Sequence, residues 1–161
     1  MQIWVDADAC PAVIKDILFR AAERARVSIT LVSNMPLRIP TSPFIKMVRV
    51  PRGFNVADQR IAELVQPGDL VVTADIPLAA SVVRLGGLAL DPRGELYTED
   101  NVHERLAVRN LMDTLRGSGT NTGGPATFNH SDRQAFANQL DRLLTARGTP
   151  GDIGPAPPGS G

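Results

Sequence analysis

Residues 1–8 read Met-Gln-Ile-Trp-Val-Asp-Ala-Asp, and the architecture expected for the chain can be worked out from this opening. Ile3 to Val5 form a short apolar run of the kind that is buried in a parallel sheet, and two acids, Asp6 and Asp8, follow it. Pro11 then stands where the first residue of a helix would lie. The opening therefore predicts a buried strand, an acidic strand end and a helix in immediate succession.

The following residues repeat this alternation of strand and helix. Apolar residues recur at helical spacing as far as residue 26, and further strands are predicted at 28–33, 45–50, 69–73 and 88–90. Helices beginning at Asn55 and near Pro77 separate the later strands. Strands and helices at this spacing predict right-handed crossovers, a mainly parallel sheet and helices on both faces, which together form a three-layer α/β sandwich.

The C-terminal part of the chain differs in character. Residues 101–147 predict a helical section packed on the sheet, because two apolar stripes recur at helical spacing there (Val108, Leu111, Met112 and Leu115; Phe136, Leu140, Leu143 and Leu144). Residues 148–161 contain nine Gly or Pro among fourteen residues, which predicts a disordered tail. We therefore expect one α/β domain over residues 1–147, followed by that tail.

Composition excludes several classes of protein. The chain has 161 residues, and its 17 Lys and Arg balance its 17 Asp and Glu, so the net charge does not attract nucleic acid. No apolar run approaches the ~20 residues of a membrane span, and the N-terminus lacks the pattern of a signal peptide. Cys10 is the only cysteine, which excludes a disulfide scaffold and a multi-cysteine zinc module. These features predict a cytoplasmic protein with no membrane partner.

Acidic residues follow the predicted strands at positions where a parallel sheet places its chemistry. Asp6, Asp8 and Asp75 come at strand ends, and Asp58 lies one turn into the helix that begins at Asn55. In an extended backbone Asp6 and Asp8 would project to the same side. Each acid except Asp6 also has a structural explanation, because Asp75 and Asp8 precede helices and Asp58 has the spacing of a capping box with Asn55.

Carboxylates that converge without basic neighbours are costly to keep ionised, and a divalent cation removes that cost. Oxygen ligands of this kind suit Mg²⁺ or Mn²⁺, so Asp6, Asp8, Asp58 and Asp75 are the predicted metal ligands and catalytic residues. The matching reaction is metal-assisted hydrolysis of a phosphodiester. Arg52 and Arg93 lie beside these acids in the sequence and are the predicted phosphate contacts.

These motifs resemble a known family. Residues 4–11, Trp-Val-Asp-Ala-Asp-Ala-Cys-Pro, resemble the opening of the YaiI/YqxD family of bacterial proteins, and residues 53–58, 72–79 and 91–94 provide further matches. That family is similar to PIN-like domains, many of which are Mg²⁺- or Mn²⁺-dependent ribonucleases. The resemblance implies a PIN-like fold, RNA as the substrate, and matching roles for Asp6, Asp58 and Asp75; Asp91 is only an approximate match to a fourth acid.

Two alternatives remain open from the sequence. The same fold could serve as a non-catalytic module that binds nucleic acid or protein. Alternatively, an Asp-x-Asp unit after an apolar strand opens phosphatases of the haloacid-dehalogenase type, in which Asp6 would be the nucleophile and Asp8 the acid/base. The phosphatase pattern is incomplete here, because no lysine follows Lys46 and Ala9 stands where Gly or Thr is usual.

Overall fold

A computed structural model describes residues 1–53, 55–117 and 128–148 of the chain. All but the first residue of the predicted tail at 148–161 lie outside the described residues. Each helix and strand predicted from the sequence within the described ranges is present, with boundaries that differ by a few residues. One further strand, described below, was not predicted.

The strands form a single sheet in the order β3-β2-β1-β4-β5-β6, in which all neighbours are parallel except the antiparallel pair β5 and β6. The short apolar runs of the sequence supply these strands, and in the central strands β1, β4 and β5 most residues are buried. The strands are β1 (Gln2–Asp6), β2 (Ser28–Ser33), β3 (Ile45–Arg49), β4 (Leu70–Val72), β5 (Leu88–Leu90) and β6 (Leu96–Tyr97).

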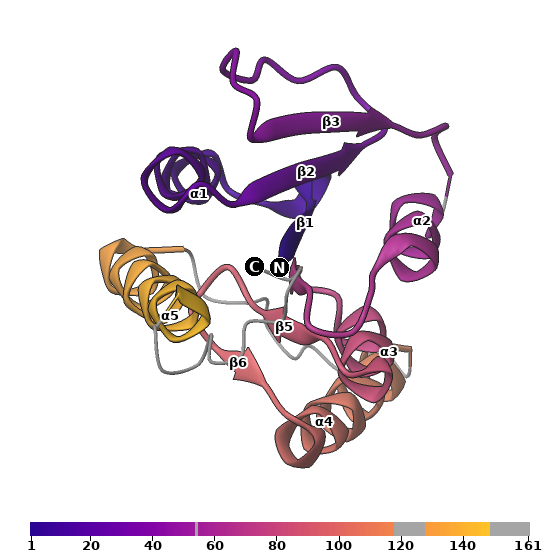
Figure 1. The fold of residues 1–161 in the computed structure, drawn as a ribbon. Helices are drawn as coiled ribbons and strands as arrows, with labels where there is room; N and C mark the ends of the chain where they lie inside the picture. The colour runs from indigo at the N-terminus through magenta and orange to yellow at the C-terminus, as the bar shows by residue number, and fades with distance from the viewer. Residues whose placement is uncertain (54, 118–127, 149–161) are drawn as a thin grey trace.

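Helices cover both faces of the sheet, as the alternation of strand and helix predicts. Helices α1 and α5 cover one face, and α2, α3 and α4 cover the other (Figure 1). The expected three-layer α/β sandwich with a mainly parallel sheet is thus confirmed. The helices are α1 (Ala12–Ala25), α2 (Val56–Leu64), α3 (Ile76–Leu85), α4 (Glu99–Gly117) and α5 (His130–Gly148), with a short 3₁₀ turn at Ala7–Ala9.

Each face of the sheet has its own hydrophobic cluster. On the α1 and α5 side, Leu18 and Phe136 pack with β-strand residues such as Ile3, and all three side chains are fully buried. On the other side, Ile61 of α2 and Val82 of α3 form a second buried cluster. Helix α5 is therefore part of the same hydrophobic core as β1.

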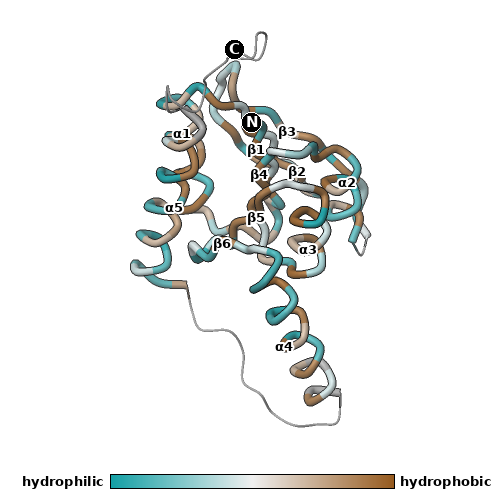
Figure 2. Tube along the Cα trace, turned by 60° about the horizontal axis from the view of Figure 1, so that its bottom comes forward, coloured by the Kyte–Doolittle hydropathy of each residue, from teal (hydrophilic) through white to brown (hydrophobic). Residues whose placement is uncertain are grey.

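The structure departs from the sequence-based expectation at two elements. Strand β6 was not predicted, because its two residues are too few to produce a recognisable alternation. In α4, Val108 and Leu111 are 44% and 56% exposed, so the apolar stripe expected to face the core is largely uncovered in the described part of the chain. Figure 2 shows why: the second half of α4 runs out beyond α3, and the buried contact of the helix is made near its start, at Val102.

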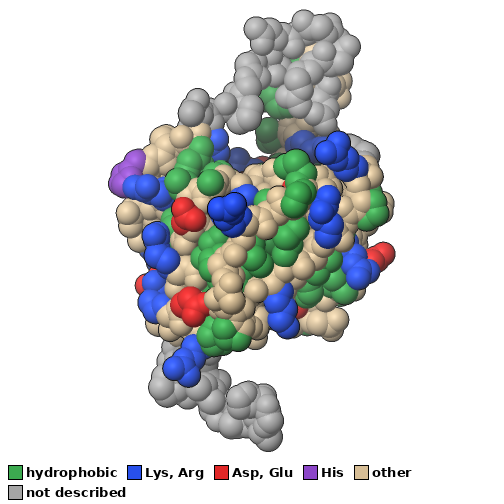
Figure 3. All heavy atoms as spheres, turned by 90° about the horizontal axis from the view of Figure 1, so that it is seen from above, with side chains coloured by type: hydrophobic (Ala, Val, Ile, Leu, Met, Phe, Trp, Pro, Cys, Tyr) green, Lys and Arg blue, Asp and Glu red, His purple; other side chains and the backbone are tan. Residues whose placement is uncertain are grey.

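Strand β3 forms one edge of the sheet, and its side chains suit an edge. Lys46 and Arg49 are exposed on it, and Figure 3, which looks down on this side, shows basic side chains spread across the face among apolar ones. Charges of this kind disfavour pairing with a strand of another molecule. In the described ranges no helix has the length and apolarity needed to cross a membrane.

Candidate active site at the carboxyl edge of the sheet

The candidate site lies between β1 and β4. From this pair, successive strands are added to the sheet toward β3 on one side and toward β6 on the other. From the central pair β1 and β4, the chain continues into α1 on one face and α3 on the other. Between two such strands the connections diverge, which leaves a crevice outside their carboxyl ends. Asp6 is the last residue of β1, and Thr73 directly follows β4, so both stand at the mouth of this crevice.

Thr73 connects two of the predicted acids. Its hydroxyl donates a hydrogen bond to Oδ2 of Asp6 at 3.2 Å and accepts one from the backbone N–H of Asp75 at 3.0 Å. Thr73 is 1% exposed and Asp6 is 8% exposed. Burial raises the pKa of Asp6, and the charges of Asp75 and Asp8 raise it further, while the Thr73 hydroxyl partly offsets the rise. The β4 end thus orients Asp6 and fixes the turn that carries Asp75.

Asp58 and Asp75 interact with each other in the site. Asp75 is the N-cap of α3, since its Oδ1 accepts the N–H of Leu78 at 2.8 Å, as the sequence allowed. Burial raises the pKa of Asp58 to about 7, and its hydrogen bond with Asp75 and the charges of Asp75 and Asp6 add to the rise. The charges of Asp75 and Asp6 and the loss of solvent thus all disfavour the ionised form of Asp58.

The start of α2 explains why Asp58 faces the crevice. Asn55 adopts a left-handed conformation with φ of 62°, and its side chain makes no capping hydrogen bond. The capping box suggested by the spacing of Asn55 and Asp58 is therefore absent. Asp58 is half-buried and interacts with Asp75 and Asp6 instead.

Asp8 is held apart from Asp58 and Asp75. The chain leaves the extended conformation after Asp6 and enters the 3₁₀ turn at Ala7–Ala9, so the alternation that would place Asp6 and Asp8 on one side stops there. Oδ1 of Asp8 accepts the hydroxyl of Ser33 at 2.5 Å, and Oδ2 accepts the N–H of Asn34 at 2.8 Å. Asp8 ties the end of β1 to the end of β2 and acts on Asp6 through its charge alone.

The two arginines predicted to contact phosphate, Arg52 and Arg93, differ in their surroundings. The guanidinium of Arg93 pairs with Asp132 of α5 at 2.8 Å and lies 5.8 Å from the centre of the Phe128 ring. Arg52 is exposed in the loop before α2. The prediction for both arginines rests on their proximity to the acids in the sequence.

A pocket of about 230 Å³ opens beside Asp58 and Asp75, and its lining includes an arginine from α4. From the sequence, Arg109 falls roughly on one helix face with Arg105 and Arg116; a solvated face is the favoured interpretation, and contact with a nucleic-acid backbone is the alternative. The presence of Arg109 here depends on the packing of α4 against α3, a long-range contact without a local signal. The lining residues are Asn55, Asp58, Gln59, Ala62, Asp75, Pro77, Leu78, Ser81 and Arg109.

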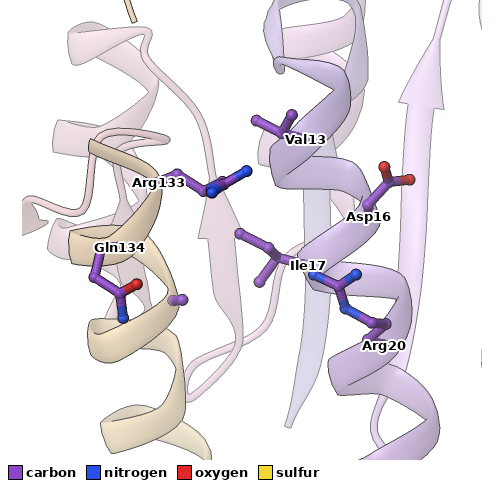
Figure 4. Close-up of a pocket in the computed structure, with 7 residues that line it drawn as sticks. Val13, Asp16, Ile17, Arg20, Arg133 and Gln134 are labelled. Carbon is purple, nitrogen blue, oxygen red and sulfur yellow. The ribbon is translucent and has the colours of Figure 1, made fainter. Parts of the chain in front are cut away.

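A larger cleft of about 360 Å³ lies between α1 and α5 and holds none of the predicted site acids. Figure 4 shows Ile17 of α1 and Arg133 of α5 extending into the space between the two helices. Arg133 also contacts Nδ1 of His130 at 2.6 Å. This cleft lies on the opposite face of the sheet from the pocket beside Asp58.

Two other polar side chains near the strand ends have structural roles. Cys10 is buried, and burial raises the pKa of its thiol to about 12, which removes it as a nucleophile at neutral pH. Asp91 accepts hydrogen bonds from the N–H of Arg93 at 2.6 Å and from the hydroxyl of Tyr97 at 3.2 Å. It therefore fixes the turn between β5 and β6.

The described residues contain no group of three or more His, Cys, Asp or Glu side chains arranged to hold a metal ion. The acids that interact electrostatically are Asp6, Asp58 and Asp75. Their mutual repulsion adds to burial in raising the pKa of Asp6 and of Asp58.

Together the fold and this edge define an α/β sandwich protein with a carboxyl cluster at the switch point of a parallel sheet. The chain belongs to the YaiI/YqxD family, whose model, described as uncharacterised, matches residues 4–146. It is 62% identical over 148 residues to a UPF0178 protein of Herminiimonas arsenicoxydans, covering 92% of this chain and 99% of that one. It is 63% identical over 150 residues to a UPF0178 protein of Burkholderia ambifaria, covering 93% and 100%. No solved structure matches the chain.

Proposed function

We propose that the chain is a cytoplasmic, divalent-metal-dependent nuclease that hydrolyses phosphodiester bonds of RNA at the carboxyl edge of the sheet. The observation that carries the proposal is the convergence of three acids at the carboxyl edge: Thr73 joins Asp6 to the turn that carries Asp75, and Asp58 lines a pocket beside Asp75. The raised pKa of Asp58 agrees with this crowding. Clusters of this kind are typical of sites that act on a charged ligand. The lone buried thiol is in keeping with a reducing compartment.

The chemistry of the donor set fits Mg²⁺ or Mn²⁺. Asp6, Asp58 and Asp75 offer only carboxylate oxygens, which are the ligands that these ions prefer. The charge of the ion would offset the repulsion between carboxylates that raises the pKa of Asp58. When bound, such an ion supplies a water of lowered pKa and neutralises charge on the phosphodiester.

The chain's own residues have separate tasks in this proposal. Thr73 keeps Asp6 oriented through its hydroxyl, and the N-cap bond to Leu78 anchors Asp75 to α3. Asp8 bonds to Ser33 and so joins the end of β1 to the end of β2, and its charge raises the pKa of Asp6. Asp58, ionised beside the ion, would supply one of the carboxylate oxygens that hold it.

The first test measures thermal unfolding of the full chain with and without Mn²⁺ or Mg²⁺. We expect the unfolding temperature to rise by about 5–10 °C at a metal concentration about a hundredfold above the dissociation constant. Asp58→Asn and Asp6→Asn should each remove most of that rise. Glu63→Gln, which removes an exposed charge from the same helix as Asp58, is the matched control and should keep it.

The second test follows cleavage of a single-stranded RNA oligonucleotide by the same four proteins. Wild type and Glu63→Gln should cleave it in Mn²⁺, and the two aspartate variants should not. Absence of any metal-induced rise, or a rise that survives Asp58→Asn, contradicts the metal site. RNA binding without cleavage would favour a binding module, and hydrolysis of p-nitrophenyl phosphate with no effect on RNA would favour a phosphatase.

A further inference from the structure

The pocket beside the acids is built from three helices, and one of them contributes a positive charge. α2 supplies Asp58 and α3 supplies Asp75, while α4 supplies Arg109. Val102, which is 2% exposed, marks the side of α4 that packs on the core. Arg109 follows it by seven residues, two helical turns, so its Cα lies on a similar side of α4; its side chain is exposed and lines the mouth of the pocket.

The pocket combines groups that would respond differently to an anionic substrate. Carboxylates repel a phosphodiester, whereas a guanidinium forms two parallel hydrogen bonds with phosphate oxygens. Among the residues that line this pocket, Arg109 is the only cationic one. The amides of Asn55 and Gln59 lie in the same lining and can donate further hydrogen bonds.

Its size and lining restrict what part of a nucleic acid it can recognise. A volume of about 230 Å³ is below the ~300–1,000 Å³ of pockets for larger ligands, and is suited to a phosphate with part of its sugar. No aromatic side chain is among the lining residues, so the pocket offers no surface on which a base could stack.

We propose that Arg109 binds the phosphate of the scissile nucleotide, and that the pocket reads the backbone of a single strand without preference for the base. This inference rests on the proposed function, because it places the substrate at the same carboxyl cluster. Arg109 takes the role that the sequence assigned to Arg52 and Arg93. α4 thereby completes the site with a side chain that neither α2 nor α3 supplies.

The test compares wild type with Arg109→Gln, Arg109→Lys and a matched control, Arg105→Gln. Arg105 lies one turn earlier on α4, where its side chain pairs with Glu95, so the control removes an equal charge from the same helix. Each protein is assayed for cleavage of labelled single-stranded RNA homopolymers in Mn²⁺ and for binding of the same oligonucleotides over a range of salt. Thermal unfolding with and without Mn²⁺ is recorded in parallel.

We expect Arg109→Gln to raise KM and weaken RNA binding by about ten- to hundredfold, and to reduce the salt dependence of binding by about one ionic contact. Arg109→Lys should fall between it and wild type, and Arg105→Gln should match wild type. The Mn²⁺-induced rise in unfolding temperature should persist in all four proteins. Homopolymers of different bases should be cleaved at rates within about threefold of each other.

Each contrary result has a separate meaning. An active wild type whose KM and salt dependence are unchanged in Arg109→Gln overturns the role of Arg109 and leaves the metal site standing. Strong base preference in the active wild type overturns backbone reading. A wild type that neither responds to Mn²⁺ nor binds RNA overturns both this inference and the proposed function.

Discussion

One hydroxyl group organises the carboxyl edge of the sheet. Thr73 is almost fully buried, donates to Asp6 and accepts from the backbone of Asp75. A buried hydroxyl with both functions satisfied holds two acids from different strands in a fixed relation, whereas unsatisfied it would cost about 1–3 kcal/mol. The sequence hinted at this residue only through the spacing Thr-Ala-Asp at 73–75, because nothing in that motif says which neighbouring strand the hydroxyl meets.

At the same scale, Asp58 makes the stability of the metal-free protein depend on pH. Its folded-state pKa of about 7 lies above the ordinary value of 3.8, so the folded chain holds a proton that the unfolded chain releases. The contribution of Asp58 to the free energy of unfolding therefore falls as pH rises from about 4 to about 7, and it stays constant at higher pH. Allowing for solvent screening of a half-buried group, we expect this residue to account for about 1–2 kcal/mol of the fall.

Urea denaturation in EDTA at about pH 5 and about pH 8 measures this effect. Asp58→Asn keeps the shape of the side chain and removes its titration, so the variant should lose less stability than wild type between the two conditions. In EDTA at the higher pH it should also be the more stable protein. Equal losses in the two proteins would show that the crowding of Asp58 does not act on folding.

Site residues could be predicted where a local sequence pattern sets their position, but not where the packing of distant helices sets it. Asp6, Asp58 and Asp75 follow from apolar runs and helix starts, because a parallel sheet brings its strand ends to one edge. Asp8 bonds to residues at the end of β2, because a 3₁₀ turn stands where the sequence predicted extended backbone. The sequence placed Arg109 on a basic helix face but not beside these acids, since that position depends on how α4 packs on α3.

At the scale of the elements, the contact between α5 and the β5–β6 turn depends on a glycine. Gly94 has φ of +98°, and a Cβ there would lie 2.6 Å from the carbonyl carbon of Ala135 and 2.7 Å from the backbone nitrogen of Phe136. These are backbone atoms of α5 and cannot move aside without shifting the helix. The Pro-Arg-Gly string at 92–94 is typical of a turn, but only the packed structure reveals that this turn lies against a helix.

We therefore expect Gly94→Ala to lower the free energy of unfolding by about 3 kcal/mol or more, through both backbone strain and displacement of α5. Gly68→Ala is the matched control, because Gly68 has φ of +89° with open space around its missing Cβ. The control should lose only the strain, about 1 kcal/mol. Urea unfolding of the two variants measures the difference, and equal losses would mean that α5 does not rest on Gly94.

At the scale of the whole molecule, the two hydrophobic clusters share one sheet. Phe136 of α5 lies in the cluster on the α1 side and is fully buried, whereas Trp4 packs against the cluster on the α2 and α3 side. Trp4 is the only tryptophan, and its indole N–H donates to Oδ2 of Asp69 at 3.1 Å. Its fluorescence therefore reports on the face opposite to Phe136.

This arrangement predicts that a destabilising substitution in one hydrophobic cluster also lowers the unfolding midpoint of the other cluster. Phe136→Ala removes a large buried ring, and we expect it to lower the free energy of unfolding by about 3–5 kcal/mol. Because β1 contributes Ile3 and Val5 to one cluster and Trp4 to the other, the helical signal in circular dichroism and the Trp4 fluorescence should shift together in urea, with coincident midpoints. A variant whose circular dichroism transition shifts while its Trp4 transition stays at the wild-type midpoint would show that the α5 layer unfolds independently of the sheet. In that case α5 would be a separable addition to the layers that carry the acids, and the sheet would not transmit the loss from one face to the other.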